Sequence, residues 1–132
     1  MASKRYPPTD PREWLNRARS NLALAKNDTV GALFEDLCFE AQQAAEKAVK
    51  AVFVHRGVSF PYVHDLDELL QRLERTGVKI PKYVREADEL TPFAVVMRYP
   101  GFAAPITKRE HRRAIRIAER VLRWAERKVR QA

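Results

Sequence analysis

The sequence predicts an all-α protein, a single five-helix up-down bundle that spans residues 1–132 as one domain. Three observations lead to this prediction. Apolar residues recur at the spacing of amphipathic helices, helix-capping motifs stand at the expected helix starts, and alternating strand patterns of useful length are absent. With 45% hydrophobic residues, a chain of this length is expected to bury its own core.

Capping motifs mark three of the expected helix starts. Asp10, Pro11 and Glu13 form the first, with Asp10 as the N-cap, proline at the first helical position and a reciprocal glutamate. A similar motif begins at Asp65 and, with threonine as the cap, at Thr107. The resulting helices are expected to run roughly over residues 10–27, 32–56, 65–76, 81–97 and 107–131.

Glycine and proline mark the other boundaries. Gly31 separates the first two helices, and Gly57 and Gly77 stand where C′ glycines end the second and third. Pro92 falls inside the fourth helical pattern, so we expect a kink or a restarted helix there. Residues 1–9 contain two prolines and no apolar run, and we expect them to form a loose N-terminal arm.

The second expected helix carries apolar residues on more than one side. Its alanine-rich face predicts the close approach of a neighbouring helix, because small side chains let helix axes come nearer. That face comprises Phe34, Leu37, Ala41, Ala44, Ala45, Ala48 and Val52. Phe39, Glu46 and Phe53 recur at seven-residue spacing away from it. They indicate either the broad core of a buried helix or a second packing surface, which would be a homodimer interface.

All of the excess positive charge lies in the last quarter of the chain. Residues 1–97 hold 14 basic and 14 acidic residues, whereas residues 98–132 hold 11 basic and 3 acidic ones, which accounts for the net charge of +8. Eight arginines gather on one side of the last expected helix: Arg109, Arg112, Arg113, Arg116, Arg120, Arg123, Arg127 and Arg130. This surface favours a phosphate-bearing partner, although an arginine-rich thermophilic surface is an alternative.

Two of these arginines have a simpler explanation. Glu119 and Glu126 precede Arg123 and Arg130 by four residues, which predicts ion pairs along the helix surface. The remaining six arginines would repel one another unless acidic groups or phosphates meet them. The last helix therefore predicts a surface that binds anions.

Composition also argues against several classes of protein. No apolar run approaches the ~20 residues of a membrane span, and the N-terminus lacks the apolar segment of a secretory signal. Cys38 is the single cysteine, which excludes an internal disulfide and agrees with a cytoplasmic location. No set of Cys, His or acidic residues has metal-ligand spacing, so we expect neither a metal nor a cofactor.

Two segments carry a family resemblance. Residues 39–51 contain the pattern A-Q-Q-A-x-E-K and are followed by His64-Asp65-Leu66, and Arg98-Tyr99-Pro100-Gly101 precedes the last helix. In this order, across roughly residues 10–130, they resemble HEPN domains, the higher eukaryotes and prokaryotes nucleotide-binding domains. The resemblance implies a helical bundle that commonly dimerises. It also implies pairing with a minimal nucleotidyltransferase, often as a toxin–antitoxin pair.

The resemblance further implies that ribonuclease activity would depend on an R-x(4–6)-H motif, and this chain departs from that motif. No arginine stands at the required spacing before His55, His64 or His111. We therefore expect a non-catalytic module that binds a nucleotide or RNA and acts with a nucleotidyltransferase. One alternative is a ribonuclease toxin that uses His64, Arg98 and Tyr99 as atypical active-site residues. The other is an interaction subunit that docks an acidic partner.

Candidate contacts to a nucleotide or phosphate come from three places. Arg98 and Tyr99, before Pro100, would grip a phosphate and stack on a base; alternatively they satisfy helix carbonyls and pack in the core. Gln43 and Lys47 lie one turn apart and line either a solvated rim or a cleft shared with Arg98. The last helix contributes Arg109, Arg112, Arg116, Arg120 and Arg123.

Overall fold

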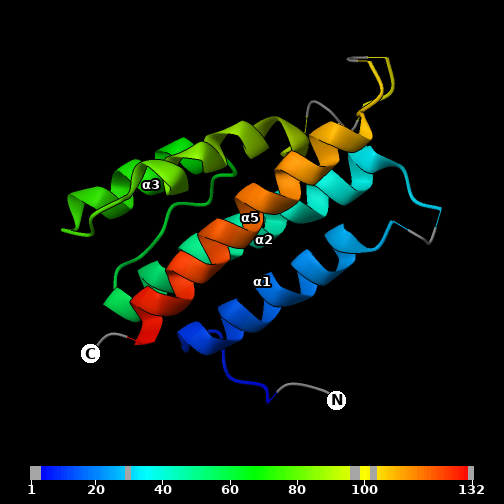
Figure 1. The fold of residues 1–132 in the computed structure, drawn as a ribbon. Helices are drawn as coiled ribbons and strands as arrows, with labels where there is room; N and C mark the ends of the chain where they lie inside the picture. Colours follow the sequence, from blue (N-terminus) through cyan, green and yellow to red (C-terminus); the bar gives the residue numbers. More distant parts are fainter. Residues whose placement is uncertain (1–3, 29–30, 96–98, 102–103, 131–132) are drawn as a thin grey trace.

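The computed structural model describes residues 4–28, 31–95, 99–101 and 104–130. The helical elements are α1 (Pro11–Lys26), α2 (Phe34–Arg56), α3 (Leu66–Arg75), α4 (Lys82–Arg85), the 3-10 helix η1 (Glu86–Ala94) and α5 (Lys108–Arg130) (Figure 1). The part of the chain so described contains no strand, and the all-α prediction is confirmed. None of its helices combines the length and apolar character that crossing a membrane requires.

The predicted caps are present, with one change. The Asp65 carboxylate accepts from the Glu68 amide at 3.2 Å, and Thr107 and Glu110 bond each other's backbone amides reciprocally. Gly57 ends α2 in the left-handed conformation, at φ 69°. At the start of α1, the Asp10 carboxylate caps the helix, but the Glu13 carboxylate does not accept from the Asp10 amide, which donates to the Pro7 carbonyl at 2.9 Å.

The Glu13 carboxylate instead forms hydrogen bonds with the N-terminal segment. The expectation that residues 1–9 form a loose arm is therefore wrong for residues 4–9. The Glu13 carboxylate is buried and accepts from the Arg5 guanidinium and, at 3.1 Å, from the Tyr6 amide. The Arg5 hydrogen bond is the main reason that the pKa of Glu13 lies well below its usual range. The Trp14 indole donates to the Pro8 carbonyl at 2.8 Å. These bonds fasten the segment along α1.

The fourth helix differs from its prediction over residues 81–97. Only α4 is α-helical, and the chain then continues as η1, a tighter 3-10 helix that contains Pro92. Pro92 has no amide hydrogen for an α-helical bond to the carbonyl of Asp88 and disfavours α geometry at Thr91, so a regular α-helix is not expected to continue through it. The Thr91 hydroxyl accepts from the Leu66 amide at 3.1 Å and so ties η1 to the start of α3. Residues 96 and 97 lie outside the described part of the chain.

The core surrounds α2, which contacts α1, α3, η1 and α5. Ala41, Ala44, Ala45 and Ala48 are completely buried, as the expected close approach of neighbouring helices requires. Helix α1 lies beside α2 and α5, and the α3–η1 region covers another side of the same pair (Figure 1). Two ion pairs, Arg19–Glu126 and Lys26–Glu119, show that α1 and α5 run antiparallel.

Candidate functional site

The basic residues of α5 divide into two edges that differ in their neighbours. We define the η1 edge as Arg113, Arg120 and Arg127, which are seven residues apart and face α4 and η1. Each of them contacts an acceptor there: Arg113 with Glu89, Arg120 with Glu86 and Arg127 with the hydroxyl of Tyr83. The η1 edge is therefore engaged in interactions within the chain.

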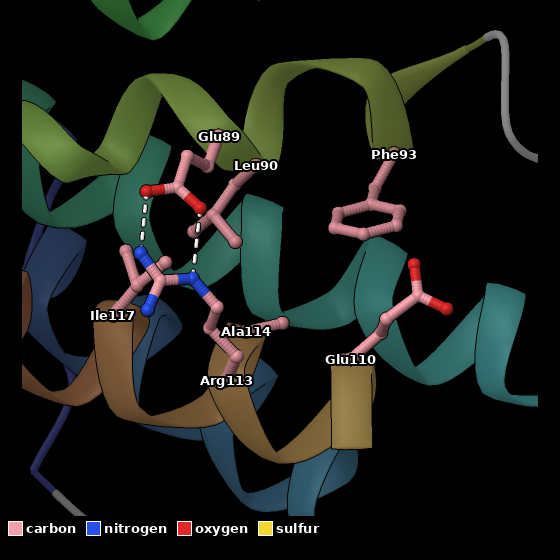
Figure 2. A pocket seen from close by; sticks show the side chains of 7 residues that line it. All are labelled: Glu89, Leu90, Phe93, Glu110, Arg113, Ala114 and Ile117. Carbon is pink, nitrogen blue, oxygen red and sulfur yellow. Dashed lines mark hydrogen bonds and ion pairs between the residues drawn. The ribbon is translucent and has the colours of Figure 1, made fainter. Parts of the chain in front are cut away.

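Figure 2 shows the strongest contact of this edge, between Arg113 and Glu89. The guanidinium donates two hydrogen bonds to the carboxylate, at 2.8 and 2.6 Å, which is the bidentate geometry that suits an arginine–carboxylate pair. The pair lies beside a pocket of about 150 Å³ that Leu90, Phe93 and Ile117 also line. Arg113 thus fastens η1 to α5.

The opposite edge of α5 lacks such partners. We define the open edge as Lys108, Arg112 and Arg116, which are four residues apart and exposed. No carboxylate in the described residues lies within ion-pair distance of any of the three. The same holds for the exposed Arg109 near the start of the helix. The first half of α5 therefore presents four cations without a carboxylate partner among the described residues. Lys128 and Arg130 in the last turn likewise have no such partner, and Arg127 contacts only a neutral hydroxyl.

The ion pairs predicted along α5 are only partly present. Arg123 lies 4.0 Å from Glu119, at the limit of an ion pair, while Glu119 approaches Lys26 of α1 at 2.6 Å. The pair predicted between Glu126 and Arg130 is wrong, because the Glu126 carboxylate turns to Arg19 of α1, at 2.6 Å. A carboxylate at the boundary of two helices can reach a cation on either one, and here the neighbouring helix is preferred.

The other predicted contacts lie apart from this surface. Tyr99 is 60% exposed and lines an open pocket of about 470 Å³ with Asp36 and Val95. Neither Gln43 nor Lys47 lines that pocket. Arg98 lies outside the described residues, so its predicted cleft with Gln43 and Lys47 is not described either.

Gln43 and Lys47 already have partners within the chain. The Gln43 amide donates to Gln42 at 2.7 Å, and the Lys47 ammonium donates to the Asn21 side chain at 2.8 Å. Burial is the main reason that the pKa of Lys47 is lowered. The Asn21 amide in turn donates to Glu40 at 2.7 Å. These side chains form a polar seam between α1 and α2.

Two of the three residues considered for a homodimer interface lie inside the monomer. Phe53 is 1% exposed and packs edge-on against Phe60, and Glu46 is 3% exposed. Only Phe39 is half-buried. The broad core of α2, the alternative weighed for this spacing, therefore accounts for Glu46 and Phe53. Of the three, Phe39 is the residue that a second copy of the chain could contact.

Glu46 is the centre of a buried polar network that the sequence pattern did not reveal. Its carboxylate accepts from Lys50 and from Gln42, each at 2.8 Å, and lies 2.9 Å from Nδ1 of His64. Burial acts to raise the pKa of Glu46, but the hydrogen bonds from Lys50, His64 and Gln42 outweigh it, so the pKa lies below its usual value. Glu46 is therefore ionised beside a buried Lys50.

His64 is exposed on its outer side, whereas His111 is buried. The side chain of His64 is 63% exposed, and only its Nδ1 contacts the buried carboxylate. His111 bonds the Ala25 carbonyl through Nε2 at 2.7 Å and stacks on Phe34, in a structural role. Across the described ranges, no group of three His, Cys, Asp or Glu residues is placed to hold a metal ion.

Comparisons with known proteins agree on one family. The family model described as the HEPN domain matches residues 11–128. The crystal structure of TT1696 from Thermus thermophilus is 33% identical, with a TM-score of 0.79, and the match covers 89% of this chain and 97% of that one. The structure of ST0689, described as an archaeal HEPN homologue, is 27% identical with a TM-score of 0.75, over 92% of this chain and 98% of that one. No curated protein matches this chain.

The Glu46 network generates a prediction about stability. Replacing Glu46 with Gln leaves the Lys50 ammonium buried without its counter-ion, and we expect a loss of about 3 kcal/mol in the free energy of unfolding at neutral pH. The matched control is Glu40→Gln, which alters a half-buried carboxylate on the same helix and is expected to cost less than about 1 kcal/mol. Urea unfolding followed by circular dichroism measures both.

The pH dependence follows from the lowered pKa. In the unfolded chain, the pKa of a glutamate carboxylate is about 4.3. When the pKa is lower in the folded chain, the ionised carboxylate stabilises the fold at any pH above the unfolded pKa. This stabilisation is lost as the pH falls through the folded pKa. The stability difference between wild type and Glu46→Gln should therefore be full at pH 7 and shrink below about pH 4 to 5. A difference that does not change with pH would contradict an ionised Glu46.

Proposed function

Because this chain belongs to the HEPN domain family, we propose that it is a non-catalytic module that binds a nucleotide or RNA on the outer surface of α5. One observation carries the proposal: the first half of α5 presents exposed cations that no described carboxylate neutralises. These are Lys108, Arg109, Arg112 and Arg116. Guanidinium groups bind phosphate oxygens through paired hydrogen bonds, as they bind carboxylates, so a phosphate fits this surface.

The proposed binding surface includes further residues beside these four cations. Arg120 and Arg123 continue it toward the end of α5, each with one distant carboxylate, at 3.7 and 4.0 Å. Tyr99 offers an exposed aromatic ring on which a base can stack. Arg98, Gln43 and Lys47 stay candidates, although Gln43 and Lys47 already have hydrogen-bond partners on α2 and α1.

The first test is binding to single-stranded RNA and its dependence on salt. If four to six phosphates are contacted, log K should fall with log salt concentration at a slope of about −3 to −4. Fluorescence anisotropy with a labelled oligouridylate, and separately with a labelled ATP, measures the affinity across a salt series. Absence of binding to both probes at low salt would remove this function.

The proposed protein partner is a minimal nucleotidyltransferase encoded beside this chain, with the two acting as a toxin–antitoxin pair. Support comes from the family resemblance and from the basic surface, which can also dock an acidic protein. We expect the two proteins to co-purify when they are expressed together. Reversing the charge of Arg116 and Arg120 distinguishes an interaction subunit from a nucleotide-binding module. In an interaction subunit, it would abolish co-purification and leave RNA binding unchanged.

The alternative of a ribonuclease has one specific observation in its favour. The His64 imidazole contacts a buried carboxylate through Nδ1 and has an exposed outer side, an arrangement seen in acid–base catalysis. The main proposal expects purified protein to leave varied RNAs intact, as measured by gel electrophoresis. Cleavage that His64→Ala abolishes and the matched control His55→Ala preserves would establish the ribonuclease instead.

A further inference from the structure

The open edge of α5 forms one wall of a pocket, and α1 forms the other. Lys108, Arg112 and Arg116 line it from α5. Lys26, at the end of α1, completes the set of cations. The pocket has a volume of about 350 Å³, and its remaining lining residues are Asp28, His111 and Ile115.

The charges in the pocket do not cancel. Four cations line it against one carboxylate, that of Asp28. Lys26 also pairs with Glu119 outside the lining, at 2.6 Å, so four positive charges face two negative ones, and an excess of +2 remains. Helix α5 begins at Lys108, and the positive end of its dipole lies at this end, where the Glu110 carboxylate in the first turn offsets it in part. The pocket is suited to an anion.

On the α1 side of the pocket, hydrogen bonds occupy carbonyl groups that would otherwise repel an anion. A helix C-terminus such as that of α1 ordinarily repels anions through its free carbonyls. Here the Ala25 carbonyl accepts from buried His111 at 2.7 Å, and the Leu24 carbonyl accepts from the Asn27 amide at 3.1 Å. His111 also stacks on Phe34, with ring centroids 5.0 Å apart, which fixes its position. His111 and the end of α1 are therefore fixed in position without a bound ligand.

The open edge differs from the η1 edge in the partners of its cations. Both edges belong to the same helix and carry the same type of side chain, but every arginine of the η1 edge meets an acceptor from α4 or η1. Like charges four residues apart on a helix repel each other. The open edge bears this repulsion over about 12 Å of helix, and a bound anion would relieve it.

We propose that the pocket between α1 and α5 binds a phosphate group, held chiefly by the guanidinium groups of Arg112 and Arg116. This inference rests on the proposed function and selects, from the surface of α5, the residues that make the specific contact. The phosphate belongs either to the backbone of an RNA strand or to a free nucleotide. Arg109 and Arg120 then contribute through the general positive field rather than through direct contact.

The test compares two double variants that remove the same charge. Arg112→Ala/Arg116→Ala deletes the proposed contacts, and the matched control Arg113→Ala/Arg127→Ala deletes two arginines of the η1 edge. We expect the first variant to weaken oligouridylate binding at least about tenfold and to reduce the magnitude of the salt slope by about 0.7, since the two guanidinium groups hold one phosphate and each single-strand phosphate contact contributes about 0.7. The control should change the affinity less than about threefold. Circular dichroism verifies that both variants are folded.

A third variant, Arg112→Lys/Arg116→Lys, keeps the charge and removes the paired donors. It should retain the salt slope and still lose affinity, because lysine cannot form the bidentate contact. Direct titration with ATP identifies the source of the phosphate. Weakened ATP binding in Arg112→Ala/Arg116→Ala points to a free nucleotide, and an effect confined to oligouridylate points to the RNA backbone. Both results support the pocket.

Two outcomes would overturn the inference and are distinguishable from failure of the proposed function. Equal losses in the two double variants would mean that binding follows the total charge and not this pocket, while the nucleic-acid function would stand. Unchanged RNA binding in Arg112→Ala/Arg116→Ala, together with loss of a protein partner, would assign the pocket to an acidic protein. If the wild type binds neither oligouridylate nor ATP at low salt, the proposed function itself fails.

Discussion

The burial of α2 on nearly every side constrains the rest of this structure. A helix in that position can meet α1 and α5 closely only through small side chains, which explains its completely buried alanines. Any polar group on such a helix must find its partner inside the protein, because water does not reach it. Gln42, Glu46 and Lys50 satisfy this condition together, and His64 closes the network from the loop before α3.

The position of α5 follows from that of α2. Its apolar residues lie against α2, so its charged residues have to occupy the outer sides, where they meet whatever the neighbouring elements provide. The start of η1 provides Glu86 and Glu89, whereas the end of α1 provides mainly Lys26. The contrast between the two edges of α5 is therefore produced by the neighbours and not by the sequence of α5 itself.

Sequence patterns predicted most of the fold, because caps and apolar spacing are local properties. They failed where a distant contact decides the outcome. Glu13 matches a capping motif, yet its carboxylate is taken by Arg5 and Tyr6. The seven-residue spacing of Glu46 and Phe53 suited an interface as well as a core, and only their burial distinguishes the two. Likewise, helical periodicity placed eight arginines on one side of α5 but could not separate those that meet η1 from those that line the pocket.

The difference between the arginines that meet η1 and those that line the pocket matters for anion binding because of how charge is distributed along the chain. Residues 1–97 carry no net charge, so the +8 of the whole chain originates in the last quarter. Salt screens charges over about 8 Å at physiological ionic strength, which is shorter than the ~34 Å length of a 23-residue helix. An anion at one end of α5 therefore interacts mainly with the cations beside it. In the proposed binding mode, the net charge attracts a polyanion to the helix, and the local arrangement of Arg112, Arg116 and Lys26 selects the position of the phosphate.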